Sequence, residues 1–419
     1  MEQPMQIGSN QDKVFKIFLW LLSIVSLYNI YATTAFFQQF RMLKMVMGVV
    51  MIMAEVLLVV MAIRTYSDYK TIISKGILAL IMVVILYNLA HIIYATIWDE
   101  STVFLSFFGN PIYQPAFMLP VAALLGVDDD GFGPLLKCVS YYTLLIIPIY
   151  AVSRYMNVFV GMGLLFLLAF LRYMPRKWRL FLLVFAVAYI AFSYYDDARA
   201  PILRVLMGLA VMLVSYTSLY KSKFLKVIIY VAIVCVPLYF LSLFVRTGYS
   251  VFEQSSTSER VSRMGVAETG DTRTFLYEEV FEDLSDNDAW IFGKGINGTY
   301  YSSYFENTKN SNEVSDRVLA EVGMLDFLLK GGIAQTVMYL LLLLIAVFKC
   351  FFFSNSRAMV LVGLILLIHY VFLFIEDVPR FDLFNVCIWF FIGMTFSPEV
   401  LEKDDQYFED KFSLLFAKR

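Results

Sequence analysis

The chain is a succession of apolar segments, most of them about as long as a membrane is thick. Since an α-helix rises about 1.5 Å per residue, it needs about 20 apolar residues to cross the hydrocarbon core. Counted against that length, about twelve segments of the chain qualify. A mean hydropathy of +0.71 with 60% hydrophobic residues is typical of polytopic membrane proteins and excludes an ordinary soluble multi-domain chain of 419 residues. We therefore predict an all-α polytopic membrane protein with about twelve transmembrane helices.

The clear segments lie near residues 14–36, 45–63, 75–97, 134–153, 180–195, 202–220, 226–245, 332–349, 358–375 and 382–397. Two weaker ones lie near 112–127, which prolines interrupt, and near 156–171, and both are short for a straight crossing. Four parts are thus predicted: transmembrane helices 1–9 over 1–245, an external loop with amphipathic helices over 246–330, transmembrane helices 10–12 over 331–397, and a cytoplasmic tail over 398–419.

One stretch, from Arg246 to Lys330, is too polar to lie in lipid. It holds 15 of the 35 acids but only 8 of the 33 bases, so it is net negative while the remainder is net positive. Short connections on one side of the predicted bundle collect more Lys and Arg than those on the other. This bias places both termini in the cytoplasm and the polar stretch outside, between the ninth and tenth helices. We expect the chemistry to take place there.

Helical patterns recur inside this stretch. Residues 272–284 read as an amphipathic helix that Asp271 is placed to cap, with one apolar and one acidic stripe. Residues 315–329 again have apolar residues at spacings of three and four, and should lead into the next span through Gly331 and Gly332. In the tail, residues 407–416 are either an amphipathic helix on the inner membrane surface or a solvated terminus.

Three glycines in six residues, Gly293, Gly295 and Gly298, predict a turn. Their spacing matches the dinucleotide-binding fingerprint, but that fingerprint works only within a βαβ unit, and this context is absent. Two interpretations remain open. The turn either brings backbone amides of Gly293 and Gly295 close to a ligand or is simply a tight loop.

Arginines mark the predicted outer ends of several spans. Arg199 lies in a short outer connection and Arg204 follows within the first turn of the next span. A guanidinium at this depth is costly unless it meets an anion or a carboxylate, so both are candidate substrate-binding groups. An ion pair with Asp196 or Asp197 is the structural alternative.

Further arginines could converge on the same cavity: Arg246, Arg273 and Arg317. Convergent arginines suit a pyrophosphate, because the planar guanidinium holds two oxygens at once. The structural alternative for Arg246 is snorkelling, in which its long side chain reaches the membrane–water interface. Arg273 could equally be a solvated residue of a first helical turn.

The acids nearest these arginines in the loop are Glu278, Glu279 and Glu321, any of which could act as a general base on a sugar hydroxyl. Glu321 is preferred because its neighbours are uncharged, and its structural alternative is a salt bridge with Arg317 one helical turn earlier. Glu55, inside the second span, is either functional or hydrogen-bonded to a neighbouring helix.

Metal chemistry is not expected. His91 and His369 lie in different spans without Cys or Asp companions, so structural hydrogen bonds are their expected role. The four cysteines match neither a zinc site nor a disulfide framework. Arg380 lies among Glu376, Asp377 and Asp382, so we predict an outer loop in which these opposite charges neutralise one another. We predict no cofactor, no metal and no nucleic-acid partner.

Three places in the chain resemble the O-antigen polymerase and ligase family of membrane glycosyltransferases. Asp197-Ala198-Arg199-Ala200 is similar to the arginine between small residues that the family often shows at the outer end of a span. Asp271-Thr272-Arg273 before an amphipathic helix and Trp290 to Gly295 is similar to the arginine helix and glycine turn of the large periplasmic loop. The stretch from Arg317 to Gly332 is similar to the helix that closes that loop. Family ligases usually carry a histidine near that helix, and its absence from this loop favours a polymerase.

The resemblance implies metal-independent, inverting transfer of a glycan from a polyprenyl-diphosphate carrier to a lipid-linked repeat unit, for surface polysaccharide or lipopolysaccharide synthesis at the outer face of the inner (plasma) membrane. Membrane lipid and a chain-length regulator protein are the other expected partners. Arg199, Arg246, Arg273 and Arg317 would bind the diphosphate and stabilise its developing charge, with Glu321 as the base. Two other classes stay open. A lipid-linked oligosaccharide flippase or other transporter usually shows two related halves, which are not visible here, and an envelope assembly protein would leave the arginines unexplained.

Overall fold

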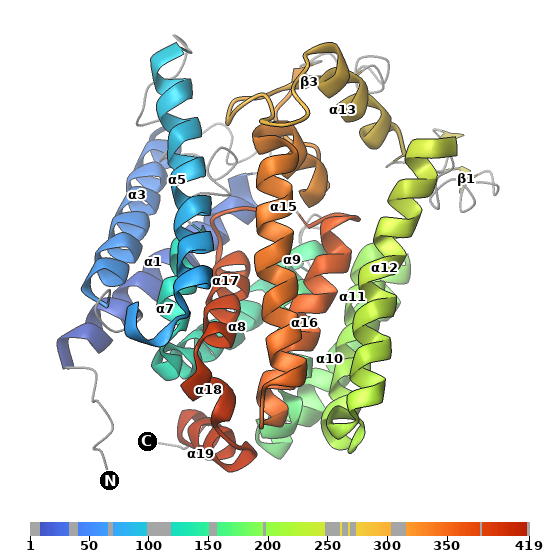
Figure 1. The fold of residues 1–419 in the computed structure, drawn as a ribbon. Coiled ribbons are helices and arrows are strands. Elements are labelled where there is room, and N and C mark those ends of the chain that lie inside the picture. The colour runs from blue at the N-terminus through green and yellow to red at the C-terminus, as the bar shows by residue number, and fades with distance from the viewer. Residues whose placement is uncertain are drawn as a thin grey trace.

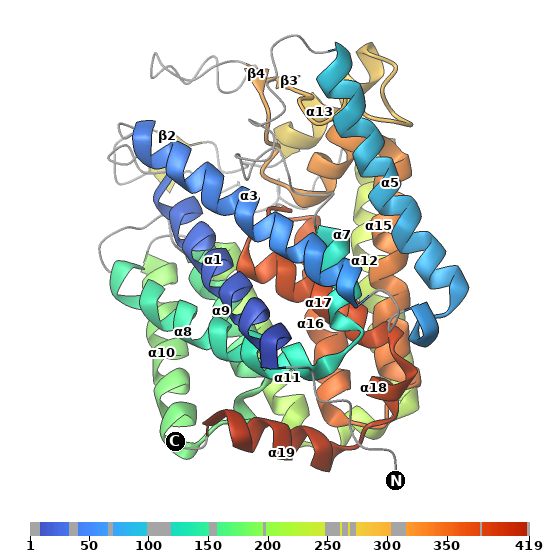
Figure 2. The ribbon, with the colours of Figure 1, turned by 90° about the vertical axis from the view of Figure 1, so that its left-hand side faces the viewer.

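The computed structural model describes residues 9–32, 41–65, 70–98, 119–150, 157–195, 198–247, 260–261, 267–268, 274–302, 316–377 and 379–416. Helices dominate this part of the chain and pack into one bundle (Figures 1 and 2). As far as its residues are described, every apolar segment predicted as a span coincides with a helix. The helices of the first part are α1 (Ser9–Ala32), α3 (Arg41–Arg64), α5 (Lys75–Trp98), α7 (Leu119–Gly126), η1 (Asp129–Gly131), α8 (Phe132–Tyr150), α9 (Asn157–Ala169), η3 (Leu171–Tyr173), α10 (Arg176–Tyr195), α11 (Arg199–Tyr216), η4 (Leu219–Lys221) and α12 (Lys223–Thr247).

The second part contains two short antiparallel ladders, one helix outside the bundle and the last helices. Strand β1 (Arg260–Val261) pairs with β2 (Ala267–Glu268), and β3 (Tyr300–Tyr301) pairs with β4 (Asp316–Arg317). The helices are α13 (Thr274–Asp286), α15 (Gly323–Phe352), α16 (Arg357–Leu373), α17 (Leu383–Phe396), α18 (Pro398–Glu402) and α19 (Asp405–Phe416). Helices α13 and α19 lie at opposite ends of the bundle, which we call the α13 end and the α19 end (Figure 1).

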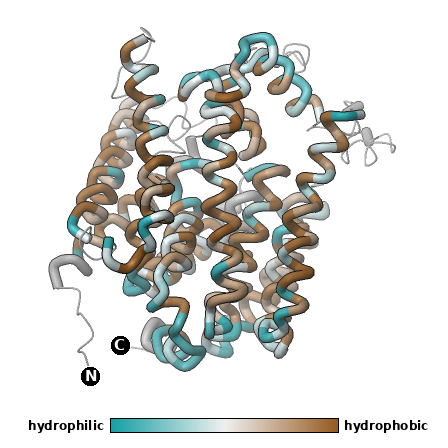
Figure 3. Tube along the Cα trace, in the orientation of Figure 1, coloured by the Kyte–Doolittle hydropathy of each residue, from teal (hydrophilic) through white to brown (hydrophobic). Residues whose placement is uncertain are grey.

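Six of the described helices are long and apolar enough to cross a membrane. They contain the segments Met45–Arg64, Lys75–Ile97, Arg176–Tyr195, Arg199–Tyr216, Lys223–Thr247 and Gly323–Phe352, and shorter apolar helices cover Val160–Ala169, Arg357–Leu373 and Leu383–Phe396. Hydrophobic residues fill the middle of the bundle and hydrophilic ones gather at its two ends (Figure 3). The chain is therefore an all-α membrane protein. The count of twelve crossings and the external position of the polar stretch stay predictions.

Close backbone contact between α7 and α17 forms part of the bundle core. A side chain at Gly126 would place its Cβ 1.9 Å from the carbonyl oxygen of Phe390, and one at Gly393 would come equally close to that of Ala123. Small residues let helix backbones approach in this way inside membranes. Helix α17 is thereby held against α7. It begins at Leu383, and the side chain of Asp382 caps it by accepting a hydrogen bond from the Asn385 backbone amide at 2.8 Å.

One predicted helix begins later than expected. The pattern predicted a helix from Ser315, but residues 316–317 form strand β4 against Tyr300–Tyr301, and α15 begins only at Gly323. Glu321 has a φ of 61°, in the left-handed region that few residues other than glycine adopt, and it turns the chain before the helix starts. The pairing of β4 with a distant strand overrides the local helical spacing here.

The tail forms the predicted amphipathic helix, α19, but its apolar face contacts protein. Phe408 and Phe412 are buried, and their rings pack edge-on against the ring of Phe132 at the start of α8. The Lys403 ammonium lies 2.8 Å from a carboxylate oxygen of buried Asp129. This helix is therefore neither a solvated terminus nor a helix whose apolar face is free for lipid.

Candidate functional site

Residues 274–302, which we call the cover, lie at the α13 end of the bundle (Figure 1). The predicted amphipathic helix is confirmed as α13, and its apolar stripe is turned inward with Leu276, Tyr277, Val280 and Leu284 buried. The hydroxyl of Tyr277 donates to the carbonyl oxygen of Phe374 at 2.7 Å, so the cover is bonded to the connection between α16 and α17. The proposed cap, Asp271, lies outside the described residues.

The glycine turn of the cover completes a broken helix. Helix α15 is interrupted at Gly332, whose φ is 65° and ψ is -168°. The amides of Lys294 and Gly295 donate to the carbonyls of Leu329 and Lys330, at 2.7 and 3.0 Å, on one side of the break.

On the other side of the break, the amides of Ile333 and Ala334 donate to the carbonyls of Trp290 and Ile291, at 2.8 and 3.2 Å. Backbone groups that a break exposes need such partners inside a membrane. Of the two interpretations of the turn, this geometry fits the tight loop, because the amides of Lys294 and Gly295 are occupied by α15, and that of Gly293 donates to Ala289 at 2.8 Å. A role for Gly293 and Gly295 in substrate binding stays a prediction.

Arg204 of α11 is buried in an ion-pair cluster. Its side chain is 1% exposed, and its Nη2 atom lies 2.5 Å from Oδ1 of Asp377 and 3.2 Å from Oε1 of Glu376. The guanidinium carbon also lies 4.2 Å from the ring centre of Phe372. The local sequence suggested that Arg380 neutralises Glu376 and Asp377. The structure shows that both acids also pair with Arg204, a cation from a distant helix.

Asp377 also binds His369 of α16, and the chain of contacts continues to Tyr339 of α15. The Nδ1 atom of His369 lies 2.9 Å from Oδ2 of Asp377, and its Nε2 atom lies 2.8 Å from the Tyr339 hydroxyl oxygen. Burial opposes ionisation of Asp377, yet Arg204 and His369 hold the pKa of its carboxyl below the ordinary value of 3.8.

These contacts indicate which ring nitrogen of a neutral His369 carries the proton. An ionised carboxylate only accepts hydrogen bonds, so Nδ1 of His369 carries the proton and donates it to Asp377. Nε2 then accepts a hydrogen bond from the Tyr339 hydroxyl. An imidazole oriented by a carboxylate, with its second nitrogen unprotonated and accepting from a hydroxyl group, is an arrangement that a general base can have.

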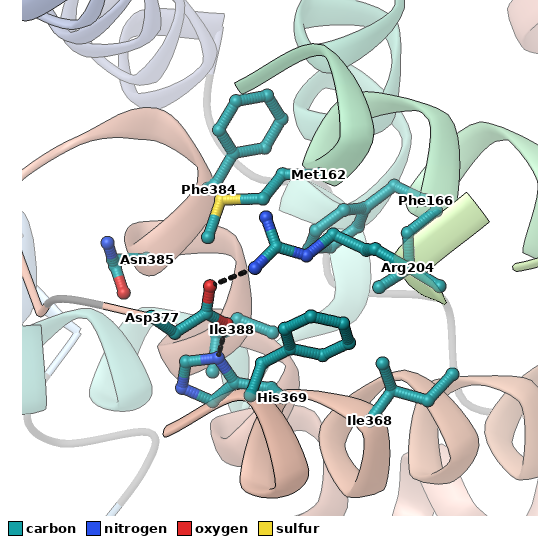
Figure 4. A pocket seen from close by; sticks show the side chains of 11 residues that line it. Met162, Phe166, Arg204, Ile368, His369, Asp377, Phe384, Asn385 and Ile388 are labelled. Carbon is teal, nitrogen blue, oxygen red and sulfur yellow. Dashed lines mark hydrogen bonds and ion pairs between the residues drawn. The ribbon is translucent and has the colours of Figure 1, made fainter. Parts of the chain in front are cut away.

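A small cavity adjoins this network (Figure 4). Arg204, His369, Asp377 and Asn385 are its polar lining residues, and Met162 of α9 is among the apolar ones. The space has room for about one or two water molecules. A sugar ring does not fit there as the side chains stand.

A second buried pair lies in the first turns of α15. The Nζ atom of Lys330 is 4.0 Å from Oδ1 of Asp326, and this oxygen also accepts the Ala320 amide at 2.9 Å. Nearby, burial raises the pKa of the Asp382 carboxyl to about 6, although the Asn385 amides and Arg380 favour its ionised form. The α13 end therefore combines several charged groups that are almost inaccessible to water.

The predicted arginines have different settings. Arg199 and Arg246 are exposed, at the start of α11 and in the last turn of α12. Since a short turn joins these two helices, they run in opposite directions, and both arginines lie at the α13 end of the bundle (Figure 1). Arg204 is buried and paired, so its charge is compensated within the protein. Arg273 lies outside the described residues.

Arg317 and Glu321 form the salt bridge that was the structural alternative for Glu321. Nη2 of Arg317 lies 2.6 Å from Oε1 of Glu321, whose side chain is 53% exposed. The bridge closes across a strand and a left-handed turn rather than along a helix. A catalytic role of Glu321 stays a prediction, but the residue is exposed and paired, and is not held in a partly apolar cavity.

Sequence reasoning missed His369, Asp377, Glu376 and Tyr339 as members of a site. The sequence does contain one signal, a pair of acids seven and eight residues beyond a histidine, at the end of an apolar span. Local spacing could not show that Arg204 and Tyr339 complete the network.

One described group of acids has metal-ligand geometry. Carboxylate oxygens of Asp128, Asp129 and Asp130, at the α19 end, lie within 4.8 Å of one another. The ammonium groups of Lys403 and Lys411 lie 2.8 and 3.0 Å from the two carboxylate oxygens of Asp129. These lysines take the place that a cation would occupy.

Comparisons with protein-family models, curated proteins and solved structures found no match to this chain.

Proposed function

We propose that this chain is a membrane polysaccharide polymerase, which transfers a growing glycan from a polyprenyl-diphosphate carrier to the hydroxyl of a lipid-linked repeat unit. The observation that carries the proposal is the orientation of His369 by Asp377 beside buried Arg204, close to the one polar cover among the described residues. Transfer of a glycan to a hydroxyl group needs a base in a fixed position to remove the hydroxyl proton, and His369 is held in this way. The α13 end would then face away from the cytoplasm.

In this proposal the acceptor hydroxyl donates to Nε2 of His369, directly or through the Tyr339 hydroxyl, and loses its proton there as the glycosidic bond forms. Asp377 stabilises the resulting imidazolium, and Arg204 keeps Asp377 ionised. The favoured base is thus His369 in place of Glu321, which is exposed and paired. The anomeric carbon leaves the diphosphate on the opposite side.

The leaving diphosphate needs cations that can bind it. Arg199 and Arg246 are exposed at the same end of the bundle, and with Arg273 and Arg317 they are the proposed diphosphate ligands. Arg317 would exchange its salt bridge with Glu321 for the diphosphate. Guanidinium groups stabilise the charge that develops on the leaving oxygen. Because the cavity beside His369 is too small for a sugar, the proposal requires the outer ends of the helices to separate when substrate binds.

The test is chain growth by purified protein in lipid nanodiscs, supplied with lipid-linked repeat units and followed as a ladder on a gel. His369→Gln should lose about 10²- to 10⁴-fold in rate, as expected for removal of a general base. Glu321→Gln is the matched control and should keep most of the activity. Arg273→Lys should lose most activity, because lysine cannot hold two oxygens in a fork.

The outcomes separate the alternatives. Unchanged chain growth by His369→Gln, together with loss of growth by Glu321→Gln, would show that Glu321 and not His369 is the general base. Transport of lipid-linked oligosaccharide across vesicles without any growth by the wild type would contradict the polymerase and favour the flippase.

A further inference from the structure

Glu55 lies at the middle of a membrane-spanning helix. The apolar segment of α3 runs from Met45 to Arg64, so Glu55 is ten residues from one end and nine from the other. At the rise of an α-helix this is about 15 Å from each end. A glutamate side chain, with two methylene groups, is too short to reach the interface from that depth.

The carboxyl of Glu55 faces the bundle interior, and no residue that the structure describes is its partner. The residue is 2% exposed, and Met51 and Leu58, on the same face of α3, are 1% and 0% exposed. Neither carboxylate oxygen has a hydrogen-bond partner among the described residues. The hydrogen bond to a neighbouring helix that would explain this residue structurally is therefore absent from this part of the chain.

No described contact supplies a counter-charge to Glu55 either. Helix α3 packs against α1 and α7. The titratable side chains that the structure describes on these elements are Lys13, Lys16 and Tyr28 of α1 and Arg64 of α3, and none of them forms a described contact with the Glu55 carboxyl. An ionised carboxylate in such surroundings costs many kcal/mol, so the group holds a proton at rest.

We propose that Glu55 is a proton-binding site inside the membrane, whose carboxyl releases its proton to water and takes it up again as the bundle changes conformation. A methionine or leucine would fill this position at lower cost, and the described part of the chain offers no hydrogen bond that offsets the burial of the carboxyl. Intramembrane carboxyls of this kind serve proton relays in pumps and transporters. The glycosyl transfer proposed above does not use this group, so the two proposals stand or fall separately.

An apolar carbodiimide tests the site. It reacts with protonated carboxyls in apolar surroundings: the carboxyl O–H adds across a C=N bond to give an O-acylisourea, which rearranges to a stable N-acylurea. The full chain in lipid vesicles is treated over a series of pH values and digested for mass spectrometry. We expect an adduct on Glu55 that decreases as the pH rises, and none on exposed Glu399, which is the internal control.

A second measurement does not depend on access by the reagent. The infrared spectrum of wild type minus Glu55→Gln should show the carbonyl band of a protonated carboxylic acid, and this band should move to lower frequency in D₂O. The band with its isotope shift, and a pH-dependent adduct, support the proposal. A missing band, or a band that does not move in D₂O, would overturn it, as would an adduct yield that is the same at every pH.

Discussion

Nη2 of Arg204 and Oδ1 of Asp377 lie 2.5 Å apart although the two residues are 173 positions apart in the chain. Both are almost fully buried, and Glu376 and His369 complete the cluster. The attraction of such groups offsets the loss of their hydration only while the set is complete. This pair therefore ties α11 to the end of α16 and orients the imidazole at the same time.

Removal of the cation should destabilise the fold. Arg204→Met leaves two acids buried without their partner, which is expected to cost about 3–5 kcal/mol of unfolding free energy. The double variant Arg204→Met/Asp377→Asn should recover part of that loss, because one of the stranded charges is gone. Arg199→Met, at the exposed start of the same helix, is the control and should change stability by less than about 0.5 kcal/mol. Thermal unfolding in detergent measures all three, and equal losses at 199 and 204 would contradict the buried pair.

Stability should depend on pH through Asp382. Its folded pKa is about 6, above the ordinary value of 3.8, so the folded state holds its proton more tightly than the unfolded state. The unfolding free energy should therefore fall as the pH rises from about 4 to about 6, and stay level above that. Asp382→Asn still caps α17 and should flatten this dependence, whereas Asp382→Ala also loses the cap, about 1 kcal/mol. A wild type that gains stability over the same pH range would contradict the assignment.

The break in α15 predicts unequal costs at two glycines with positive φ. Gly295, with φ of 83°, has no atom within 4 Å of an added Cβ, so Gly295→Ala should cost only the backbone strain, about 1–2 kcal/mol. At Gly332 a Cβ would also lie 2.3 Å from the Ile291 carbonyl oxygen. Gly332→Ala should therefore cost clearly more and loosen the cover, which protease digestion of the native protein detects. Similar behaviour of the two variants would show that the break is not closed by the cover.

The left-handed turn at Glu321 separates backbone strain from charge. Glu321→Gln removes the exposed salt bridge to Arg317 and keeps the strain, so it should cost about 0.2–1 kcal/mol. Glu321→Gly removes both and should be more stable than Glu321→Gln by about 1–2 kcal/mol. Chemical denaturation of the two variants measures the difference. If the glycine variant is the less stable one, the backbone at this position is not strained.

The helices could be predicted because a membrane demands long apolar segments, and a local pattern reveals these. The same holds for α13, whose Leu276, Val280 and Leu284 recur at helical spacing and are buried. Strand β4 could not be predicted in this way, since Asp316 and Arg317 pair with residues that lie well before them in the chain. There the local periodicity indicated a helix.

The candidate site was predicted only in part. Arg204 was singled out because a guanidinium at that depth needs an anion, and the described residues supply two, but the structural alternative named only its neighbours Asp196 and Asp197. The acids that bind it, Glu376 and Asp377, were assigned to a local loop. Tertiary contacts over such separations leave no trace in residue spacing, so neither the network nor the place of His369 in it could be derived from the sequence.

The interrupted helix has a mechanical consequence. Four backbone hydrogen bonds join residues 290–295 to both edges of the gap in α15, so this part of the cover and the two halves of that helix form one continuous piece. A flap hinged on the bundle surface could swing open alone, but this one cannot without unravelling a helix. Entry of a large lipid-linked molecule must therefore tilt that whole piece, or pass sideways between the neighbouring helices.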